Sequence, residues 1–332
     1  MSQYNDTPFK DGVTLRKAVW KKNKATLWYY PSSTKKFKTP VFITYSLINQ
    51  PFILDLLPGK STIEALVKNG FDVYLIDFGK PSLEDQQMTL SDYVSSYIHQ
   101  AVQKTLQHAR VEELTMIGYC LGGTLAAIYA SIHPKAIKNL ILLVTPIDFS
   151  KSPYFDKWVM RLRKEGTASF AYMEELGIIP SSYVKAGVRL VTTPVYFTPY
   201  ISLLLKAHDR DYVEKWIRFH TWTEGHIPMT SGVAKQMMED FTLENKLIKG
   251  SFSIQSKKAK LSNITANLLV VGTENDRLVP LHQMMPIMDK VASKDKHVHV
   301  LKGGHTAATV ENGQLPSYMD DWLTSRSILA SK

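Results

Sequence analysis

The sequence predicts an α/β fold built on a mostly parallel sheet, with helices on both faces and a helical cap insertion. Short apolar runs alternate with segments of helical periodicity as far as residue 145, and this alternation returns after residue 262. Strands separated by helices form βαβ units, which build parallel sheets. The chain between these parts has the pattern of helices and loops. We therefore expect a core formed by residues 1–145 and 262–332 and a cap formed by residues 146–261.

The elements of the core follow one another in a regular order. Strands are expected at residues 25–30, 40–45, 72–77, 113–118 and 139–145, and helices at 61–68, 91–109 and 121–132. Within 91–109, apolar residues recur at helical spacing: Tyr93, Val94, Tyr97, Ile98, Ala101, Val102 and Leu106. The last part adds strands at 267–272 and 297–301 and helices at 281–291 and 318–327.

The cap is distinguished by its dense aromatic residues: Phe149, Tyr154, Phe155, Trp158, Phe170, Tyr172, Tyr183, Tyr196, Phe197 and Tyr200. A helical insertion between two halves of one sheet is the simplest account of this change in pattern. The sequence contains no internal repeat and no low-complexity segment.

The composition is that of a globular protein, with 44% hydrophobic and 21% charged residues. The net charge is +10, but the basic residues are scattered, with small clusters at 35–38 and 257–260. This favours a solvated basic surface over nucleic-acid binding. The strongest apolar run, 140–144, is only strand-sized, so no transmembrane segment is expected. Because basic residues interrupt every apolar stretch near the N-terminus, we expect no secretory signal and place the protein in the cytoplasm.

The single cysteine, Cys120, lies in the motif Gly118-Tyr-Cys120-Leu-Gly122, between an expected strand and an expected helix. A nucleophile elbow requires this strand–turn–helix context, so the motif predicts an α/β-hydrolase fold with a nucleophilic cysteine. Gly118 and Gly122 let the strand and the helix approach the tight turn, and the helix N-terminus favours a thiolate. A buried structural cysteine is the alternative. A lone cysteine excludes internal disulfides and cysteine-rich metal sites.

An oxyanion hole is expected beside this elbow, because acyl transfer develops negative charge on a carbonyl oxygen. The backbone N–H of Leu121 is expected to form half of it. The other half is expected in the loop after the strand at 40–45, from Ser46 or Leu47.

In α/β-hydrolases the acid follows the nucleophile along the chain and the histidine comes last. Asp276 follows the strand at 267–272, and a carboxylate in that loop can reach across the carboxyl end of the sheet. Glu274 is a rival, but Asp276 is preferred because its turn precedes Leu278–Pro280, which anchors the next helix. A solvated turn aspartate is the alternative.

Of the ten histidines, only His305 has both the required chain order and a loop position. It follows the strand at 297–301 after two glycines, whose backbone lets an imidazole approach the nucleophile. Asp276 is expected to accept a hydrogen bond from the Nδ1–H of His305, which leaves Nε2 of His305 to take the proton of the Cys120 thiol. His133 and His299 are expected on the surface or in a strand. The role of His226, in the cap, is left open.

From about residue 13 to residue 322, the chain resembles the polyhydroxyalkanoate synthases, in particular the short catalytic subunits of the two-component (class III/IV) bacterial enzymes. The matching stretches are Trp20-Lys-Lys-Asn-Lys, Tyr45-Ser-Leu-Ile-Asn49-Gln-Pro-Phe-Ile-Leu-Asp55-Leu, Phe71-Asp-Val-Tyr-Leu-Ile-Asp77, Gly118-Tyr-Cys120-Leu-Gly-Gly-Thr, Asn245-Lys-Leu-Ile-Lys-Gly250, Gly272 with Asp276, and Gly304-His305. Serine is usual in this elbow, so the cysteine together with the Leu-Ile-Asn segment makes the match specific.

The resemblance implies an acyltransferase that polymerises (R)-3-hydroxyacyl-CoA, with 3-hydroxybutyryl-CoA as the short-chain substrate, and releases CoA. It implies that Cys120 carries the acyl group, with His305 as base and Asp276 as supporting acid. No cofactor and no metal are expected, since the CoA thioester is a substrate. The resemblance also implies a second synthase subunit, self-association, and a place in the cytoplasm at the surface of the polyester granule.

Some positions depart from the family. Phe78 stands where Trp is usual, and Arg277 where His usually follows the acid. The pattern Trp-x-x-Asp-Gly-Ile-Pro is here Trp222-Thr-Glu-Gly225-His226-Ile-Pro228, and the Tyr expected shortly before Asn245 is absent. Two rival functions therefore stay open: a cysteine-dependent hydrolase or thioesterase on the same fold, and a granule-associated protein that binds polymer or a partner without turnover.

Overall fold

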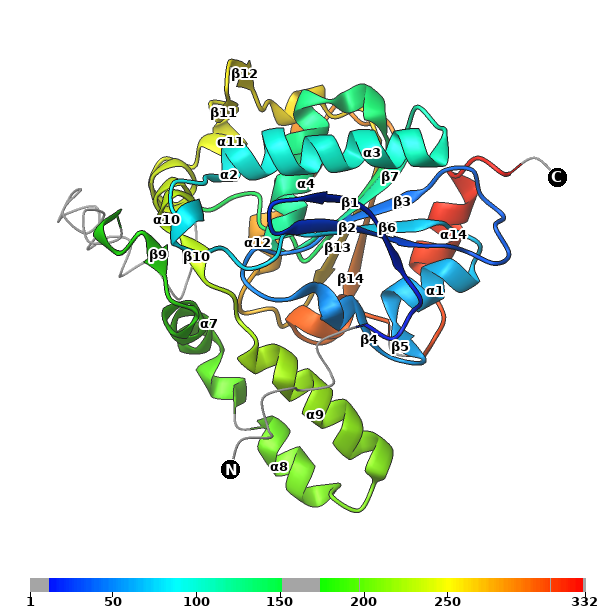
Figure 1. Cartoon of the computed structure of the whole chain (residues 1–332), viewed down its shortest axis with the longest axis vertical. Coiled ribbons are helices and arrows are strands. Elements are labelled where there is room, and N and C mark those ends of the chain that lie inside the picture. The colour runs from blue at the N-terminus through cyan, green and yellow to red at the C-terminus, as the bar shows by residue number, and fades with distance from the viewer. Residues whose placement is uncertain (1–11, 151–173, 197, 311, 331–332) are drawn as a thin grey trace.

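The computed structural model describes residues 12–150, 174–196, 198–310 and 312–330, and these form an eight-stranded sheet flanked by helices (Figure 1). Across the sheet the strands follow the order β1 (Lys17–Lys22), β2 (Ala25–Tyr30), β6 (Val73–Asp77), β3 (Val41–Thr44), β7 (Leu114–Tyr119), β8 (Ile137–Leu143), β13 (Asn267–Thr273) and β14 (Lys296–Leu301). The pairings of β2 with β1 and with β6 are antiparallel, and every pairing from β6 to β14 is parallel. The expected mostly parallel sheet is confirmed.

Helices cover both faces of this sheet, as the sequence predicts. On one face lie α2 (Leu90–Asp92), the π-helical turn η3 (Tyr93–Ile98), α3 (His99–Ala109), α4 (Leu121–Ile132), α12 (Leu281–Met284) and α13 (Ile287–Lys290). On the other face lie α1 (Thr62–Lys68) and α14 (Ser317–Ser325). Each face therefore has its own hydrophobic core.

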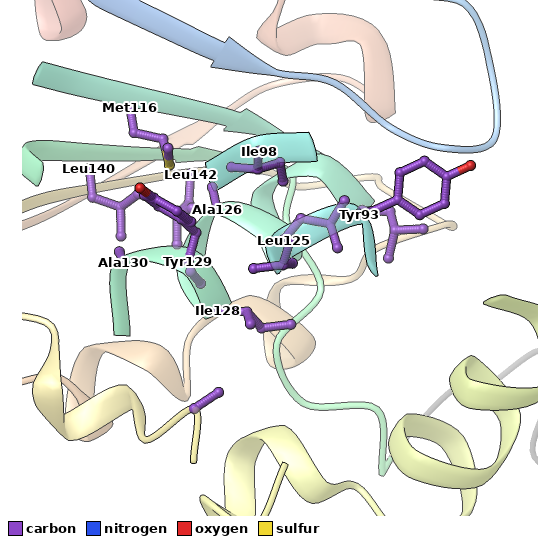
Figure 2. Close-up of a cluster of buried hydrophobic side chains, with 14 of the residues drawn as sticks. Tyr93, Ile98, Met116, Leu125, Ala126, Ile128, Tyr129, Ala130, Leu140 and Leu142 are labelled. Carbon is purple, nitrogen blue, oxygen red and sulfur yellow. The ribbon is translucent and has the colours of Figure 1, made fainter. Parts of the chain in front are cut away.

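The central strands supply side chains to both cores in turn. In β8, Leu140 and Leu142 pack in the first core, and Ile141 and Leu143 pack in the second. Figure 2 shows the first core, where side chains of α4 such as Tyr129 lie beside Leu140 and Leu142. A strand that is buried on both faces needs an unbroken apolar run, which is what made these strands recognisable in the sequence.

Several predicted boundaries agree with the structure. The strand expected at 25–30 is β2, and the helix expected at 121–132 is α4. The helix expected at 61–68 begins at Thr62, because Ser61 is its N-cap and its hydroxyl accepts the N–H of Glu64 at 2.8 Å.

One predicted helix is wrong as a single element, and another is confirmed with a change of helical winding. The helix expected at 281–291 is divided into α12 and α13, because Pro286 has no N–H to donate to the helical hydrogen-bond ladder. The helix expected at 91–109 is confirmed as one continuous helical run, in which α2, the π-helical turn η3 and α3 follow one another without a break. The strand β1 was not predicted, since three of its six residues are lysine, a residue that protects the edge of a sheet.

The chain between β8 and β13 contains α7 (Ser181–Tyr196), α8 (Thr198–Leu205), α9 (Arg210–Glu224), α10 (Ser231–Gln236), the π-helical turn η5 (Met237–Leu243) and α11 (Lys246–Lys249), with the short strands β9 (Ile178–Ile179) and β10 (Met229–Thr230). Figure 1 shows α7, α8 and α9 on one side of the sheet. Six aromatic residues expected here lie outside the described residues: Tyr154, Phe155, Trp158, Phe170, Tyr172 and Phe197. In the described ranges, no helix is long and apolar enough to cross a membrane.

Short elements complete the described fold: η1 (Pro51–Leu54), β4 (Asp55–Leu57), β5 (Lys60–Ser61), η2 (Leu83–Asp85), η4 (Pro134–Ala136), β11 (Ser253–Ile254), β12 (Lys257–Lys258), η6 (Leu261–Asn263) and η7 (His305–Ala308).

Candidate active site

Cys120 occupies the turn between β7 and α4, in a backbone conformation that residues other than glycine rarely adopt. Its φ is 52° and its ψ is −128°. Strain of this kind costs about 1–3 kcal/mol, persists only where the surroundings hold it, and is common at functional sites. Here the N–H of Cys120 donates to the carbonyl of Leu143 at 2.9 Å, which ties the turn to the neighbouring strand β8.

The glycines around Cys120 lie where no side chain fits. A Cβ on Gly118 would lie 2.3 Å from Gly123 Cα, and a Cβ on Gly122 would lie 2.4 Å from the carbonyl oxygen of Thr44. Gly123, which the sequence did not single out, has the same constraint, since its Cβ would lie 1.9 Å from Thr145 Oγ1. Close packing of α4 on the strand ends is therefore what requires all three glycines.

Leu121 is the first residue of α4, and its side chain is buried. The first N–H groups of a helix have no carbonyl acceptor within the helix. The N–H of Leu121 thus lies next to Cys120 with the partial positive charge of the helix N-terminus behind it. This is the placement expected of one oxyanion-hole donor.

His305 and Asp276 are joined by a hydrogen bond of 2.7 Å between Nδ1 and Oδ2. They come from the loops that follow β14 and β13, which are neighbours in the sheet. The N–H of Asn275 also donates to the carbonyl of Gly303 at 3.0 Å, so the two loops are fastened together. Gly303 has a φ of 117°, a conformation that favours glycine. The structure therefore brings the two predicted residues into contact.

Asp276 rather than Glu274 is the acid that faces inward. Asp276 is 6% exposed, and its Oδ1 accepts the N–H groups of Leu278 and Val279 at 2.9 Å each. Glu274 is exposed to solvent. The carboxylate of Asp276 thus accepts from three donors, two in its own turn and one on the imidazole, which fixes its orientation.

The surroundings of His305 favour its protonated form. Burial alone would lower the pKa of the imidazole, but the charges of Cys120 and Asp276 and hydrogen bonds with both side chains more than offset burial and raise the pKa to about 10. The sulfur therefore lies close enough to the imidazole to interact with it. A protonated imidazole between a sulfur and a carboxylate is the arrangement found where histidine activates a cysteine nucleophile.

Ser46 and Leu47 follow β3, which is the neighbour of β7 in the sheet, and both are buried. The contact of Gly122 with Thr44 places the start of this segment directly against the first turn of α4. The hydroxyl of Ser46 accepts the N–H of Ile48 at 3.2 Å. Both candidates for the second oxyanion-hole donor thus lie in the segment beside the elbow.

Tyr119 contacts His305, although it was not among the site residues predicted from the sequence. Its hydroxyl donates to the backbone carbonyl of His305 at 2.7 Å, and the two rings meet edge to face with centroids 5.8 Å apart. Tyr119 is 2% exposed. Its position between Gly118 and Cys120 is the only sequence signal that could have found it.

Two of the other histidines considered stack on aromatic rings elsewhere. His133 stacks on His99 with centroids 4.6 Å apart, and burial lowers its pKa to about 4. His299 stacks on Tyr318 at 4.0 Å, on the edge strand β14. His226 is half-buried in the segment after α9, where burial lowers its pKa. Among the described residues, no group of three or more histidine, cysteine or acidic side chains is arranged to hold a metal ion.

Comparison with known proteins identifies relatives along nearly the whole chain. Residues 56–311 match the family model described as alpha/beta hydrolase fold. The chain is 32% identical to the poly(3-hydroxyalkanoate) polymerase subunit PhaC of Haloferax mediterranei, over 95% of this chain and 65% of that protein. It is 30% identical to the protein of that name from Synechocystis, over 97% and 87%, and 29% identical to that from Thiocystis violacea, over 95% and 90%.

Solved structures agree on the fold. A monoacylglycerol lipase from Paleococcus ferrophilus superposes with a TM-score of 0.56 at 18% identity, covering 91% of this chain and 99% of that one. A serine hydrolase from Cycloclasticus superposes with a TM-score of 0.51 at 13% identity, covering 93% and 96%. At such identities the likeness concerns the fold alone, and it confirms the predicted α/β-hydrolase architecture.

Proposed function

Because the chain belongs to the poly(3-hydroxyalkanoate) polymerase family, whose members are acyltransferases, we propose that it polymerises (R)-3-hydroxyacyl-CoA and releases CoA. We propose 3-hydroxybutyryl-CoA as the substrate, with no further cofactor and no metal. The observation that carries the proposal is the hydrogen bond between Asp276 and His305, together with the influence of Cys120, in its strained elbow, on the pKa of His305. Acyl transfer through a cysteine needs these three groups in this order.

In the first half of the reaction, Cys120 Sγ attacks the thioester carbonyl. A bond forms between the acyl carbon and Sγ, and the bond from that carbon to the sulfur of CoA breaks. His305 holds the proton that came from the Cys120 thiol and gives it to the CoA thiolate. Asp276 keeps the imidazole oriented through Nδ1, so that Nε2 serves the sulfur. In this proposal the N–H groups of Leu121 and Ser46 stabilise the oxyanion.

In the second half, the 3-hydroxyl of another (R)-3-hydroxyacyl group attacks the acyl-cysteine. His305 accepts the hydroxyl proton, an ester bond forms, and the bond to Sγ breaks, which restores the starting pair of Cys120 and His305. A thioester suits this cycle, because exchange from CoA to Cys120 is nearly isoenergetic and the acyl group stays activated. An ester on a serine would lose that activation.

A cysteine-dependent thioesterase is the rival that one observation favours, the change from Asp-Gly to Gly225-His226 in the family pattern after α9. The two functions share the first half-reaction and differ only in whether a hydroxyl or water attacks the acyl-cysteine. Water is present at about 55 M in dilute solution, and a positioned hydroxyl can reach an effective molarity of roughly 10⁵ M or more. The aromatic insertion is the part of the chain suited to exclude water.

One experiment separates these functions. (R)-3-hydroxybutyryl-CoA is supplied to the protein together with a second synthase subunit, and CoA, free 3-hydroxybutyrate and chloroform-soluble polyester are measured. We expect CoA and polyester with little free acid. Free acid equal to CoA mole for mole would replace our proposal with the thioesterase. A protein whose Cys120 reacts with a thiol probe but which releases no CoA would point to a binding function without turnover.

We also propose that the protein works with a second synthase subunit, self-associates and acts in the cytoplasm at the granule surface. The relatives are named as polymerase subunits, which supports the first part. The test is specific activity with and without the second subunit. Full activity of the purified chain alone, without a lag, would contradict it.

A further inference from the structure

The segment 45–50, which carries Ser46, has no regular secondary structure of its own. It follows β3 as a coil and bends before η1 begins at Pro51. Within it, Ile48 donates its N–H to the Ser46 hydroxyl, and Gln50 donates its N–H to Asn49 Oδ1 at 2.7 Å. No sheet ladder or helix fixes the direction of its backbone N–H groups. Contacts from outside the segment must therefore set its conformation.

Those contacts come from residues 222–227, the end of α9 and the turn that follows it. The indole Nε1 of Trp222 donates to the carbonyl of Gln50 at 3.0 Å, and Asn49 Nδ2 donates to the carbonyl of Trp222 at 2.9 Å. Gln50 Nε2 donates to the carbonyl of Gly225 at 3.0 Å, and the N–H of Ile227 donates to the carbonyl of Ile48 at 3.1 Å. We call these four bonds the loop–helix clamp.

The clamp reaches the elbow through Tyr45. This residue is 3% exposed and packs against Tyr119 with ring centroids 5.5 Å apart, while Tyr119 holds the backbone of His305. Burial raises the pKa of the Tyr45 phenol, the charge of Cys120 raises it further, and a hydrogen bond with Trp222 lowers it. Tyr45 therefore lies near both the sulfur of Cys120 and the indole of Trp222.

Oxyanion stabilisation depends strongly on geometry, because the donors must lie about 2.7–3.1 Å from the position that the oxyanion will occupy. Loss of one donor typically costs about 10²–10³ in rate. Loss of the clamp bonds would leave the backbone N–H donor in the chain but remove the contacts that fix the conformation of the segment 45–50. The expected loss is therefore smaller than that of the donor itself.

We propose that Trp222 and Asn49 are positioning residues for acyl transfer, which act by holding the segment 45–50 in the conformation that directs its backbone N–H toward the oxyanion. The proposal rests on the acyl-cysteine chemistry proposed above, but not on CoA or on polymerisation. Under this proposal the insertion contributes to acylation, since a shift of α9 would displace the backbone N–H donor of the segment 45–50.

The test compares two reactions of Cys120 that make different demands on the site. Acylation by p-nitrophenyl butyrate, followed as the burst of p-nitrophenolate, passes through an oxyanion. Thiol–disulfide exchange with 2,2′-dithiodipyridine needs the activated sulfur but forms no oxyanion. A residue that merely supports the fold would change both rates together.

Two variants release the clamp in different ways. Trp222→Phe keeps an aromatic ring packed near Phe219 but loses the Nε1 donor. Asn49→Asp is isosteric, keeps the acceptor for the N–H of Gln50 and replaces the donor to Trp222 with a repelling oxygen. The matched control is Thr221→Val, which removes one hydroxyl bond within α9, to the carbonyl of Ile217.

We expect the acylation rate of both clamp variants to fall about 10- to 100-fold, with the exchange rate within twofold of the wild type and the control variant unchanged in both. Equal losses in both reactions, or no loss in acylation, would overturn the proposal. If only Trp222→Phe fails to fold, Asn49→Asp decides alone. A wild type that is acylated but makes no polyester would refute the proposed function and leave the clamp standing.

Discussion

Replacing Asp276 with asparagine should remove most acyl transfer and leave the fold intact. Asparagine has the same shape, and its Oδ1 can still accept the N–H groups of Leu278 and Val279, now at 2.9 Å each. Its NH₂ group, however, would face the Nδ1–H of His305, where a carboxylate oxygen now accepts at 2.7 Å. Two donors would oppose each other, so the ring would turn or adopt the other tautomer.

The magnitude follows from the charge that is lost. Two unit charges about 4 Å apart attract by about 4 kcal/mol at an effective dielectric constant of about 20, and this corresponds to about 10³ in rate. In chymotrypsin-like serine proteases, the same change of the triad aspartate lowers kcat about 10⁴-fold through the wrong tautomer. We therefore expect the rate of CoA release to fall by about 10³- to 10⁴-fold.

The assay is CoA release from (R)-3-hydroxybutyryl-CoA, with circular dichroism to establish that the variant is folded. Glu274→Gln is the matched control, because it removes the same charge from an exposed position two residues away. A Glu274→Gln variant as slow as Asp276→Asn, or an Asp276→Asn variant within tenfold of the wild type, would refute this assignment of the acid.

Four further predictions test the site and the packing of the helices. Cys120→Ala should form no acyl-enzyme, and Cys120→Ser should be acylated at best without elongating, as measured by retention of radiolabelled acyl groups and by polyester yield. Cys120→Ala should also lower the pKa of His305, because the charge of the sulfur is the largest influence that raises it, so an NMR titration should show the ring losing its proton at lower pH than in the wild type. Gly122→Ala should lower the free energy of unfolding by about 1–3 kcal/mol in urea, since its Cβ would lie 2.4 Å from the Thr44 carbonyl oxygen. Gly187→Ala, whose Cβ would meet nothing within 4 Å in α7, should raise it by about 0.5–1 kcal/mol.

The sequence was most informative where one local pattern determines structure and chemistry together. The elbow around Cys120 needs a strand, a tight turn and a helix within a few residues, so Gly118 and Gly122, although not Gly123, could be assigned from spacing alone. The sequence supported the choice of Asp276 over Glu274 less strongly than it supported the elbow, because the buried carboxylate and the exposed one are only two residues apart. Burial and the donors of Leu278 and Val279 distinguish them, and both depend on the folded turn.

Contacts between distant parts of the chain could not be predicted. Tyr119 reaches His305 across 186 positions of sequence, and Asn49 reaches Trp222 across 173. Neither pair has a spacing that one sequence could show, since the sheet order and the path of the insertion decide which side chains meet. The resemblance to a family identified segments on both sides of the second contact but not the bonds that join them.

The separation of the three candidate active-site residues along the chain has a consequence for biosynthesis. Cys120 belongs to the first half of the polypeptide, whereas Asp276 and His305 follow the last two strands of the sheet. During translation at about 5–20 residues per second, roughly 10–40 s pass between the addition of residue 120 and that of residue 305. Throughout that interval the nascent thiol has neither its histidine nor its carboxylate. A nascent chain that does not yet include residue 305 therefore cannot form this candidate site.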